Sequence, residues 1–265
     1  MGKYREVTKE LKELVKQGKS GKQISEILNL SYTTMHRKLR KLNINLPNYH
    51  NELKFNNTVF DSIDNEEKAY WLGFLYADGC VGSKEDKVEL GLAEKDLKHI
   101  EKFRNFMNIT NKISYRESTK SYRMSFRSSQ CKQDLINKGC VPKKSLILKF
   151  PTESQVPKNL IKHFIRGYFD GDGWFTNTEK CFQVGIIGTE DFIKGFLDTV
   201  ENINKENKIF NVHRENGAKR YIFGAYDDVL NFLNWIYKDV NIYPDRKYEH
   251  YLDFIQNGTK YHKNK

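Results

Sequence analysis

The sequence predicts an α+β protein made of two similar halves that follow a small all-helical domain. Three observations predict this fold class. A short apolar run ending in Asp-Gly occurs twice, alternating strand patterns follow each copy at the same spacing, and the first 45 residues hold three amphipathic stretches joined by short turns. We expect each half to have the element order αββαββα, with antiparallel sheets.

The repeated stretch reads WLGFLYADG at 71–79 and IRGYFDGDG at 165–173. In each copy the third and seventh positions are small residues, which a helix places on one face, four residues apart. Small residues at this spacing let two helix backbones approach closely. We therefore expect the two motif helices to pack against each other along these faces.

Two carboxylates, Asp78 and Asp172, occupy equivalent motif positions, 94 residues apart (172 − 78). If the helices pack as expected, both acids lie at the same end. Two adjacent carboxylates do not easily both stay ionised unless a cation lies between them. Oxygen ligands without a Cys or His cluster favour Mg²⁺ over zinc. The structural alternative is that each Gly merely ends its helix in the left-handed conformation, but two copies in matching context favour a metal site.

These two motifs resemble those of the LAGLIDADG homing endonucleases in their single-chain form, over roughly residues 66–256. The resemblance implies a saddle of antiparallel sheets over DNA. It also implies that Asp78 and Asp172 bind Mg²⁺, or Mn²⁺ in its place, with the backbone carbonyls of Ala77 and Gly171 as further ligands.

The chain departs from the family pattern at two motif positions. Tyr76 stands where the family often has an acid, and Arg166 is the second residue of the second copy. Neither change touches the position of the metal-binding acid. Asp170 lies about 200° around the helix from Asp172, so we expect it to be structural and to pair with Arg166, four residues before it.

The family also places a basic residue late in each half, near the attacking water, in a Pro-x-Lys-Ser-like stretch. Here 141–145 (VPKKS) and 243–248 (YPDRKY) fit that place. Lys144 and Lys247 are the candidates, with Lys143 and Arg246 as rivals one position earlier. The alternative is a surface lysine at a helix start, but a cation there opposes the helix dipole.

The resemblance implies a sequence-specific endonuclease that cuts both DNA strands across the minor groove, leaves 3′ overhangs and acts as a monomer. A non-cutting DNA-binding regulator and an intron RNA maturase are alternatives on the same scaffold; the presence of both acids favours cutting. A third alternative is a nuclease embedded in an intein. The first residue is Met rather than Cys or Ser, and the last three are Lys-Asn-Lys without a His-Asn junction, which favours a free-standing enzyme.

Composition agrees with a nucleic-acid partner. The 265 residues carry 45 Lys and Arg against 34 Asp and Glu, a net charge of +11, which suits nucleic acid first and an anionic membrane surface second. No apolar run approaches the ~18 residues of a membrane span, and no signal peptide is evident. Four cysteines without metal spacing predict reduced thiols. We expect a cytoplasmic protein, in a bacterial or phage-infected cell, that associates with the nucleoid through DNA.

The predicted organisation starts with a helix-turn-helix DNA-binding domain at 1–45 and a linker at 46–64. The tandem endonuclease domain follows at 65–256, with repeats at 65–150 and 158–256, and a basic tail at 257–265 ends the chain. In the third helix of the small domain, the residues expected to face the major groove are Thr33, Thr34, His36, Arg37 and Arg40.

The expected strands alternate between apolar and polar residues, so that one face packs on helices and the other meets DNA. In the strand near 122–128, Tyr122, Met124 and Phe126 alternate with polar residues. The DNA-facing candidates on the strands are Arg123, Ser125, Arg127, Gln183 and Arg220.

Overall fold

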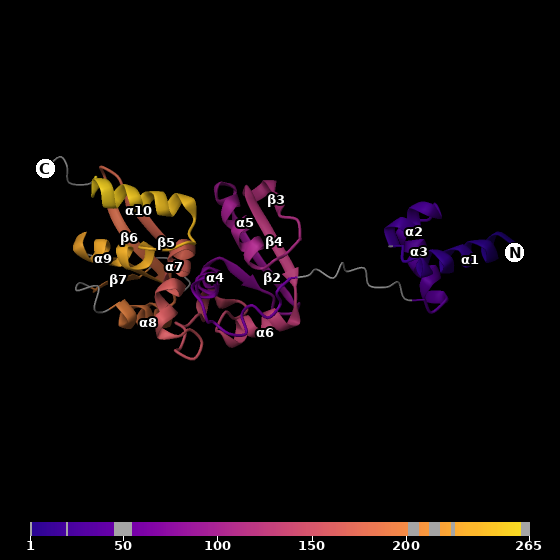
Figure 1. Cartoon of the computed structure of the whole chain (residues 1–265), viewed down its shortest axis with the longest axis horizontal. Helices are drawn as coiled ribbons and strands as arrows, with labels where there is room; N and C mark the ends of the chain where they lie inside the picture. The colour runs from indigo at the N-terminus through magenta and orange to yellow at the C-terminus, as the bar shows by residue number, and fades with distance from the viewer. Residues whose placement is uncertain are drawn as a thin grey trace. The chain divides into compact units, whose positions relative to one another are not determined.

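The computed structural model describes residues 2–19, 21–44, 55–200, 207–211, 218–223 and 226–260, with the side chains of 2–7 and 207–211 excepted. The chain divides into two compact units, Met1–Lys54 and Phe55–Lys265 (Figure 1). Each unit has its own hydrophobic cluster, so each is described by itself.

The small unit consists of three short helices, α1 (Gly2–Lys16), α2 (Gly21–Ile27) and α3 (Tyr32–Lys41). Its buried core is formed by Leu11, Leu14, Ile24, Met35 and Leu39. Ser31 caps α3, since its hydroxyl accepts a hydrogen bond from the Thr34 amide at 3.2 Å. Ser20, the residue before α2, and the side chain of Val7 in α1 lie outside the described residues.

The large unit holds the two predicted repeats in the predicted order. Repeat one comprises α4 (Glu66–Ala77), β1 (Gly79–Val81), β2 (Lys87–Ala93), α5 (Leu97–Phe106), β3 (Ser114–Arg116), β4 (Ser121–Arg127) and α6 (Ser129–Asn137). Repeat two comprises α7 (Ile161–Asp172), β5 (Gly173–Asn177), β6 (Phe182–Gly188), α8 (Glu190–Val200), β7 (Asn207–Asn211), β8 (Lys219–Phe223) and α9 (Tyr226–Tyr237). A further helix, α10 (Asp245–Asn257), follows. The α+β fold with two αββαββα repeats is therefore confirmed.

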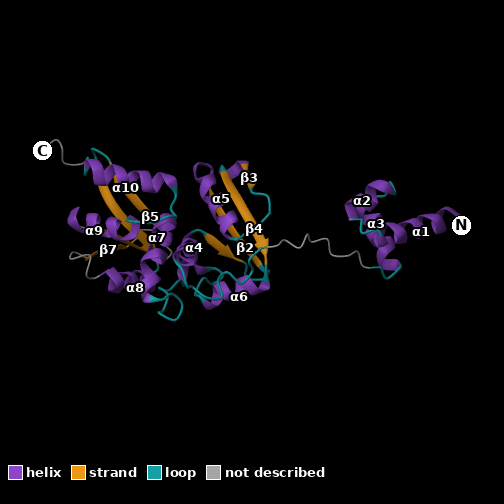
Figure 2. Cartoon of the chain, viewed as in Figure 1, coloured by secondary structure: helices purple, strands orange, loops and turns teal. Residues whose placement is uncertain are grey.

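Each repeat forms one antiparallel four-stranded sheet, and the two sheets have the same topology. The strand orders are β1-β2-β4-β3 and β5-β6-β8-β7 (Figure 2). In the first sheet Leu90 pairs with Met124, and in the second Ile186 pairs with Tyr221. All four side chains are buried. The alternation that the sequence shows therefore places the apolar face of each sheet against the helices α5, α6 and α8.

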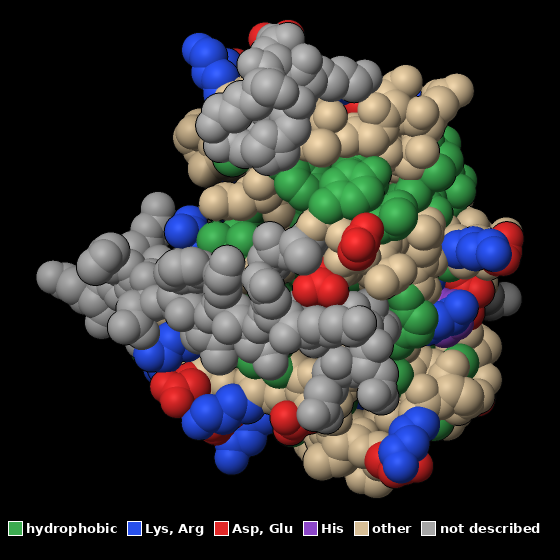
Figure 3. Space-filling view, turned by 90° about the vertical axis from the view of Figure 1, so that its left-hand side faces the viewer, with side chains coloured by type: hydrophobic (Ala, Val, Ile, Leu, Met, Phe, Trp, Pro, Cys, Tyr) green, Lys and Arg blue, Asp and Glu red, His purple; other side chains and the backbone are tan. Residues whose placement is uncertain are grey.

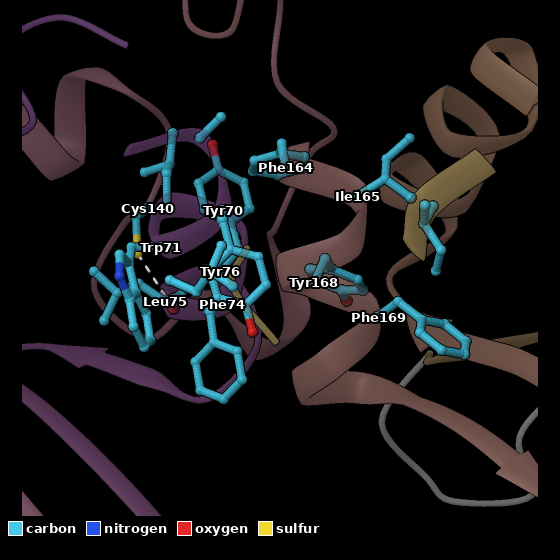
Figure 4. Packing of buried hydrophobic residues seen from close by; sticks show 14 of the residues in the cluster. Tyr70, Trp71, Phe74, Leu75, Tyr76, Cys140, Phe164, Ile165, Tyr168 and Phe169 are labelled. Carbon is cyan, nitrogen blue, oxygen red and sulfur yellow. Dashed lines mark hydrogen bonds between the residues drawn. The ribbon is translucent and has the colours of Figure 1, made fainter. Parts of the chain in front are cut away.

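The motif helices α4 and α7 pack against each other at the centre of the unit, and the small residues explain why (Figures 1 and 4). A Cβ on Gly73 would lie 2.0 Å from the Phe164 carbonyl oxygen, and a Cβ on Gly167 would lie 2.0 Å from that of Tyr70. Only glycine permits this approach of the two backbones. The predicted close packing is confirmed.

The Asp-Gly pairs do not end the helices with a glycine in the left-handed conformation, which was the structural alternative to a metal site. Neither Gly79 nor Gly173 has a positive φ, and each begins a strand, β1 or β5. A Cβ on Gly79 would lie 2.5 Å from the Leu75 carbonyl oxygen, and one on Gly173 would lie 2.5 Å from that of Phe169. Glycine is needed here because the chain turns from helix to strand directly over its last helical turn.

The predicted pairing of Asp170 with Arg166 is wrong. Arg166 is fully buried and extends to the first turn of α4, where it donates to Glu66 at 2.8 Å. Asp170 instead accepts hydrogen bonds from Tyr70, at 2.8 Å, and from Tyr237. Helical spacing alone did not reveal that both side chains meet neighbours from other helices.

Candidate active site

The two motif acids lie at the adjoining ends of α4 and α7. Asp78 directly follows α4 and Asp172 is the last residue of α7. A Cβ on Gly171, the residue before Asp172, would lie 3.2 Å from Asp78 Oδ2 and 2.3 Å from the Ala77 Cβ. The close helix packing therefore brings the two predicted acids together.

Both carboxylates are destabilised in their charged form. Desolvation by the surrounding protein atoms and the negative charge of Asp172 raise the pKa of Asp78, whose side chain still reaches solvent, to about 6, against the opposing effect of Lys247 and Lys144. Burial also raises the pKa of Asp172, and the same two lysines and the nearby Tyr168 hydroxyl oppose that rise. The site thus concentrates negative charge and surrounds it with two ammonium groups.

The two lysines occupy matching positions in the two repeats. Lys144 Nζ donates to the Gly79 carbonyl at 2.5 Å, and Lys247 Nζ donates to the Gly173 carbonyl at 2.7 Å. These glycines are equivalent in the two motifs. Lys247 also donates to the Phe169 carbonyl at 2.5 Å, and its burial lowers its pKa to about 8.

The two rival basic residues lie in different surroundings, and Arg246 lines the same recess as Asp78 and Lys247. Lys143 is exposed, with a left-handed backbone (φ 55°). Arg246 lies 3.6 Å from Asp96. The structure therefore brings Lys144 and Lys247 to the acids, while their role in the reaction stays a prediction.

Two recesses flank the acid pair, and each is lined by one of the two motif acids and by the lysine of the other repeat. A recess of about 330 Å³ is lined by Asp78 and Lys247, among others. A recess of about 230 Å³ is lined by Asp172 and Lys144. The arrangement gives two similar half-sites, each built from both repeats.

Residues that make the two half-sites unequal were only partly recognised from the sequence, which drew attention to Tyr76 and Asp170 but not to their equivalence, nor to Tyr168. Asp170 lines the first recess, whereas Tyr76 holds the equivalent motif position and lines the second. Tyr168 donates to the Ile187 carbonyl at 2.8 Å and interacts with Asp172, whereas repeat one has Phe74 at that position. Aligning the two motif copies position by position would have shown both differences.

The larger recess also rests on a contact between the repeats. Lys102 of α5 donates to Asp245 at 2.7 Å and to the Tyr243 carbonyl at 2.8 Å. Both acceptors lie at the start of α10, the helix that carries Lys247. Repeat one thus holds in place the helix that delivers the lysine of repeat two.

The donor set fits Mg²⁺. Two carboxylates with raised pKa values lie next to open recesses, and the described residues include no cluster of three or more His, Cys, Asp or Glu that could hold a metal. Mg²⁺ commonly binds through one or two carboxylates and completes its shell with water and substrate phosphate. The backbone at Ala77 and Gly171 lies beside the acids.

The strand residues predicted to meet DNA are only partly free. Arg123 pairs with Glu89 at 2.7 Å, and Arg127 pairs with Glu85 at 2.7 Å. Arg220 is exposed and lies over the Trp174 ring, 5.6 Å from its centroid. The other two candidates, Ser125 and Gln183, are half-buried.

In the small unit, four of the five α3 residues predicted to face DNA are exposed on one side of the helix. Thr33, His36, Arg37 and Arg40 are exposed. The Thr34 hydroxyl accepts a hydrogen bond from Ser31 at 2.8 Å, so it takes part in the cap of the helix. Among the residues described in either unit, no helix is long and apolar enough to cross a membrane.

Solved structures share the fold of the large unit. The I-SmaMI LAGLIDADG homing endonuclease bound to cleaved DNA matches with a TM-score of 0.50 and 13% identity, over 74% of this chain and 89% of that one. The LAGLIDADG meganuclease I-AabMI bound to uncleaved DNA matches with a TM-score of 0.50 and 12% identity, over 74% and 90%. The chain has the LAGLIDADG endonuclease fold. I-SmaMI bound to an uncleaved target in the presence of calcium ions gives the same TM-score, at 13% identity over 73% and 90%.

Sequence comparisons add little to this fold assignment. No protein-family model matches the chain. A probable translation initiation factor IF-2 of Methanocaldococcus jannaschii is 28% identical over 169 residues, which cover 59% of this chain. The match spans only 14% of that protein, so the function of the whole initiation factor is not transferred to this chain.

The raised pKa of Asp78 predicts a pH-dependent cost to folding. The folded chain holds the Asp78 proton more tightly (pKa about 6, ordinary value 3.8), so the stability of the folded state falls as the pH rises through this interval and is level above it. Asp78→Asn removes this effect. In EDTA, urea denaturation should show the variant to be more stable than the unchanged protein at pH 7.5, with the difference shrinking toward pH 4.

Glu179→Gln, at an exposed acid in the turn between β5 and β6, is the control and should follow the unchanged protein at every pH. A stability difference between Asp78→Asn and the unchanged protein that is the same at both pH values would contradict the prediction.

Proposed function

We propose that this protein is a sequence-specific, metal-dependent endonuclease that cuts both strands of duplex DNA. The observation that carries the proposal is the pair of half-sites at the α4–α7 contact. Each half-site combines one carboxylate with the lysine of the other repeat, Asp78 with Lys247 and Asp172 with Lys144. A pseudo-symmetric pair of hydrolytic sites matches the two antiparallel strands of a duplex.

We propose that cleavage occurs across the minor groove and leaves 3′ overhangs, as the family resemblance implies. The acids lie side by side at the helix ends, so they reach phosphates of opposite strands where these come closest, across the narrow groove. The net charge of +11 supports a polyanionic partner. The DNA complexes of I-SmaMI and I-AabMI support the same class of partner. Since one chain holds both half-sites, we propose that it acts as a monomer.

In this mechanism the carboxylates of Asp78 and Asp172 hold Mg²⁺, with Mn²⁺ as a substitute. When bound, the ion supplies an activated water and neutralises charge that develops on the phosphate. The structure of I-SmaMI bound to an uncleaved DNA target in the presence of calcium ions supports the involvement of a divalent ion.

The two lysines act on the phosphate that is cut. Lys144 and Lys247 are held by glycine carbonyls at 2.5 and 2.7 Å, so each ammonium group stays beside the acids. There they attract the scissile phosphate and stabilise its developing negative charge. Lys247, whose pKa is lowered to about 8, also gives up a proton more readily than an ordinary lysine.

A non-cutting DNA-binding regulator or an intron RNA maturase on this scaffold is the alternative function. Such a protein has no need to keep both half-sites. The presence of both acids and both lysines, each in the same relation to its glycine carbonyl, favours the nuclease.

The experiment that tests the proposed function uses the full chain with Mg²⁺ and a randomised duplex DNA library, followed by sequencing of the ends produced. Recovery of one preferred site with 3′ overhangs on both strands is the expected result. Binding of duplex DNA without any metal-dependent cleavage would favour the regulator.

Asp78→Asn and Asp172→Asn should each abolish double-strand cleavage, by about 10²–10³-fold or more, because each removes a charged metal ligand. Affinity for the selected duplex should stay within a few fold. Cleavage is measured on a plasmid carrying the site, and binding by electrophoretic mobility shift in Ca²⁺. Glu179→Gln is the control. Weakened binding together with residual cutting would count against the metal assignment.

Lys144→Met and Lys247→Met should each slow the cleavage of one strand by about 10²-fold, so that nicked plasmid accumulates. The matched control is the exposed rival next to Lys144, Lys143→Met, which should cut both strands at nearly the normal rate. Thermal melting confirms that the Lys247 variant is folded. Normal cleavage by Lys144→Met together with slow cleavage by Lys143→Met would reverse the assignment.

We further propose that the small unit binds DNA through the exposed face of α3. Thr33, His36, Arg37 and Arg40 lie on that face, and the unit has its own core, so it can act as a separate DNA-binding module. Deleting residues 1–45 should lower affinity for the full site by about tenfold or more and shorten the DNase I footprint. Plasmid cleavage at high enzyme concentration should persist. An unchanged footprint would show that the small unit does not touch DNA.

A further inference from the structure

Two neighbouring apolar side chains stand exposed beside the second half-site. Leu146 and Ile147 are each 59% exposed, more than any other large hydrophobic residue that the structure describes. Single exposed hydrophobic residues are ordinary, and Figure 3 shows hydrophobic side chains between charged ones on one face of the molecule. A contiguous pair next to a reactive site needs a separate explanation.

The turn that presents this pair is firmly held. The Ile147 and Leu148 amides both donate to the Lys144 carbonyl, at 3.0 and 2.9 Å. Leu148 is buried, and its carbonyl accepts the Thr189 hydroxyl of repeat two. The apolar tips are therefore fixed relative to Lys144 rather than free to fold back onto the core.

The lysines around Leu146 and Ile147 indicate what kind of molecule these two side chains contact. Exposed Lys143 and Lys149 flank it in sequence, and Lys144 lies in the recess that also contains Asp172. An apolar tip framed by three lysines complements a polyanion with an apolar interior. Duplex DNA has this combination, because its phosphates surround stacked bases.

Only one half of the protein has this feature. At the corresponding positions after Lys247, repeat two has Glu249 and His250, which belong to helix α10. Neither is apolar. Any contact that Leu146 and Ile147 make with DNA therefore lies on one side of the cleavage site.

The short distance between the two acids explains why an apolar side chain that bends DNA would be useful here. Asp78 and Asp172 are close neighbours, whereas the minor groove of B-DNA is about 6 Å wide with its phosphates along the edges. Bringing both strands to adjacent acids favours a duplex that is bent at the cutting site. Apolar side chains that enter the minor groove and part a base step produce such a bend.

We propose that Leu146 and Ile147 form an apolar wedge that enters the minor groove beside the phosphate cut at the Lys144–Asp172 half-site and unstacks the adjacent base step. The proposal rests on the proposed function, and it adds one deformed step on one side of the cleavage site.

The test places 2-aminopurine, whose fluorescence rises on unstacking, at either flank of the cleavage site in the duplex recovered from the library. With Ca²⁺ in place of Mg²⁺, the unchanged protein should raise fluorescence several fold at the flank next to the Lys144 half-site and little at the other flank. The double variant Leu146→Ser/Ile147→Ser should lose this rise and, with Mg²⁺, cut about tenfold more slowly.

The matched control is Leu252→Ser/Ile255→Ser, which removes another exposed apolar pair, 47% and 44% exposed, on α10. It should keep the fluorescence rise and the cutting rate. A rise that persists in the Leu146/Ile147 variant, or equal signals at the two flanks, would overturn the wedge while the nuclease assignment stands. Failure of the unchanged protein to bind or cut any duplex would overturn the proposed function, and the wedge with it.

Discussion

The close contact between α4 and α7 is the constraint on which the rest of the large unit depends. Gly73 and Gly167 each leave room for a carbonyl of the opposite helix, at a spot that a Cβ would fill. Because the helices approach so closely, their ends coincide and Asp78 comes beside Asp172. The strands begin at once after these ends, so each sheet is anchored to the same contact. A larger side chain at either glycine would separate the acids as well as the helices.

A buried charged residue, Arg166, lies at the contact between α4 and α7. Arg166 is fully buried on α7, yet its guanidinium reaches Glu66 of α4 and two carbonyls near the end of repeat two, those of Ile236 and Ile242. Removing one partner of such a buried group leaves the other charge without compensation. Arg166 thus ties α4, α7 and the segment before α10 together at the end of the contact away from the acids.

The two repeats share a fold but differ in the chemistry of their half-sites. Lys247 is buried and held by two carbonyls, whereas Lys144 is half-buried and held by one. Asp170, between Tyr70 and Tyr237, has no acidic counterpart in repeat one, where Tyr76 donates to the Lys138 carbonyl. The two repeats have the same sheet topology, and these residue differences make their half-sites unequal. The two DNA strands therefore meet different surroundings.

By itself the sequence determined the fold class, the repeat, the helix-to-helix contact and the pair of acids, because each depends on local periodicity or on residues at fixed spacing. It left Lys144 and Lys143 open, since adjacent positions differ only in which way the turn points. In the structure Lys144 lines the recess with Asp172 and Lys143 is exposed, and which of them acts in the reaction stays a prediction. It misplaced the partner of Arg166 because that partner, Glu66, lies 100 residues away. Contacts between distant segments, including the crossed pairing of acids and lysines, depend on how the two repeats pack, and only the tertiary structure decides that.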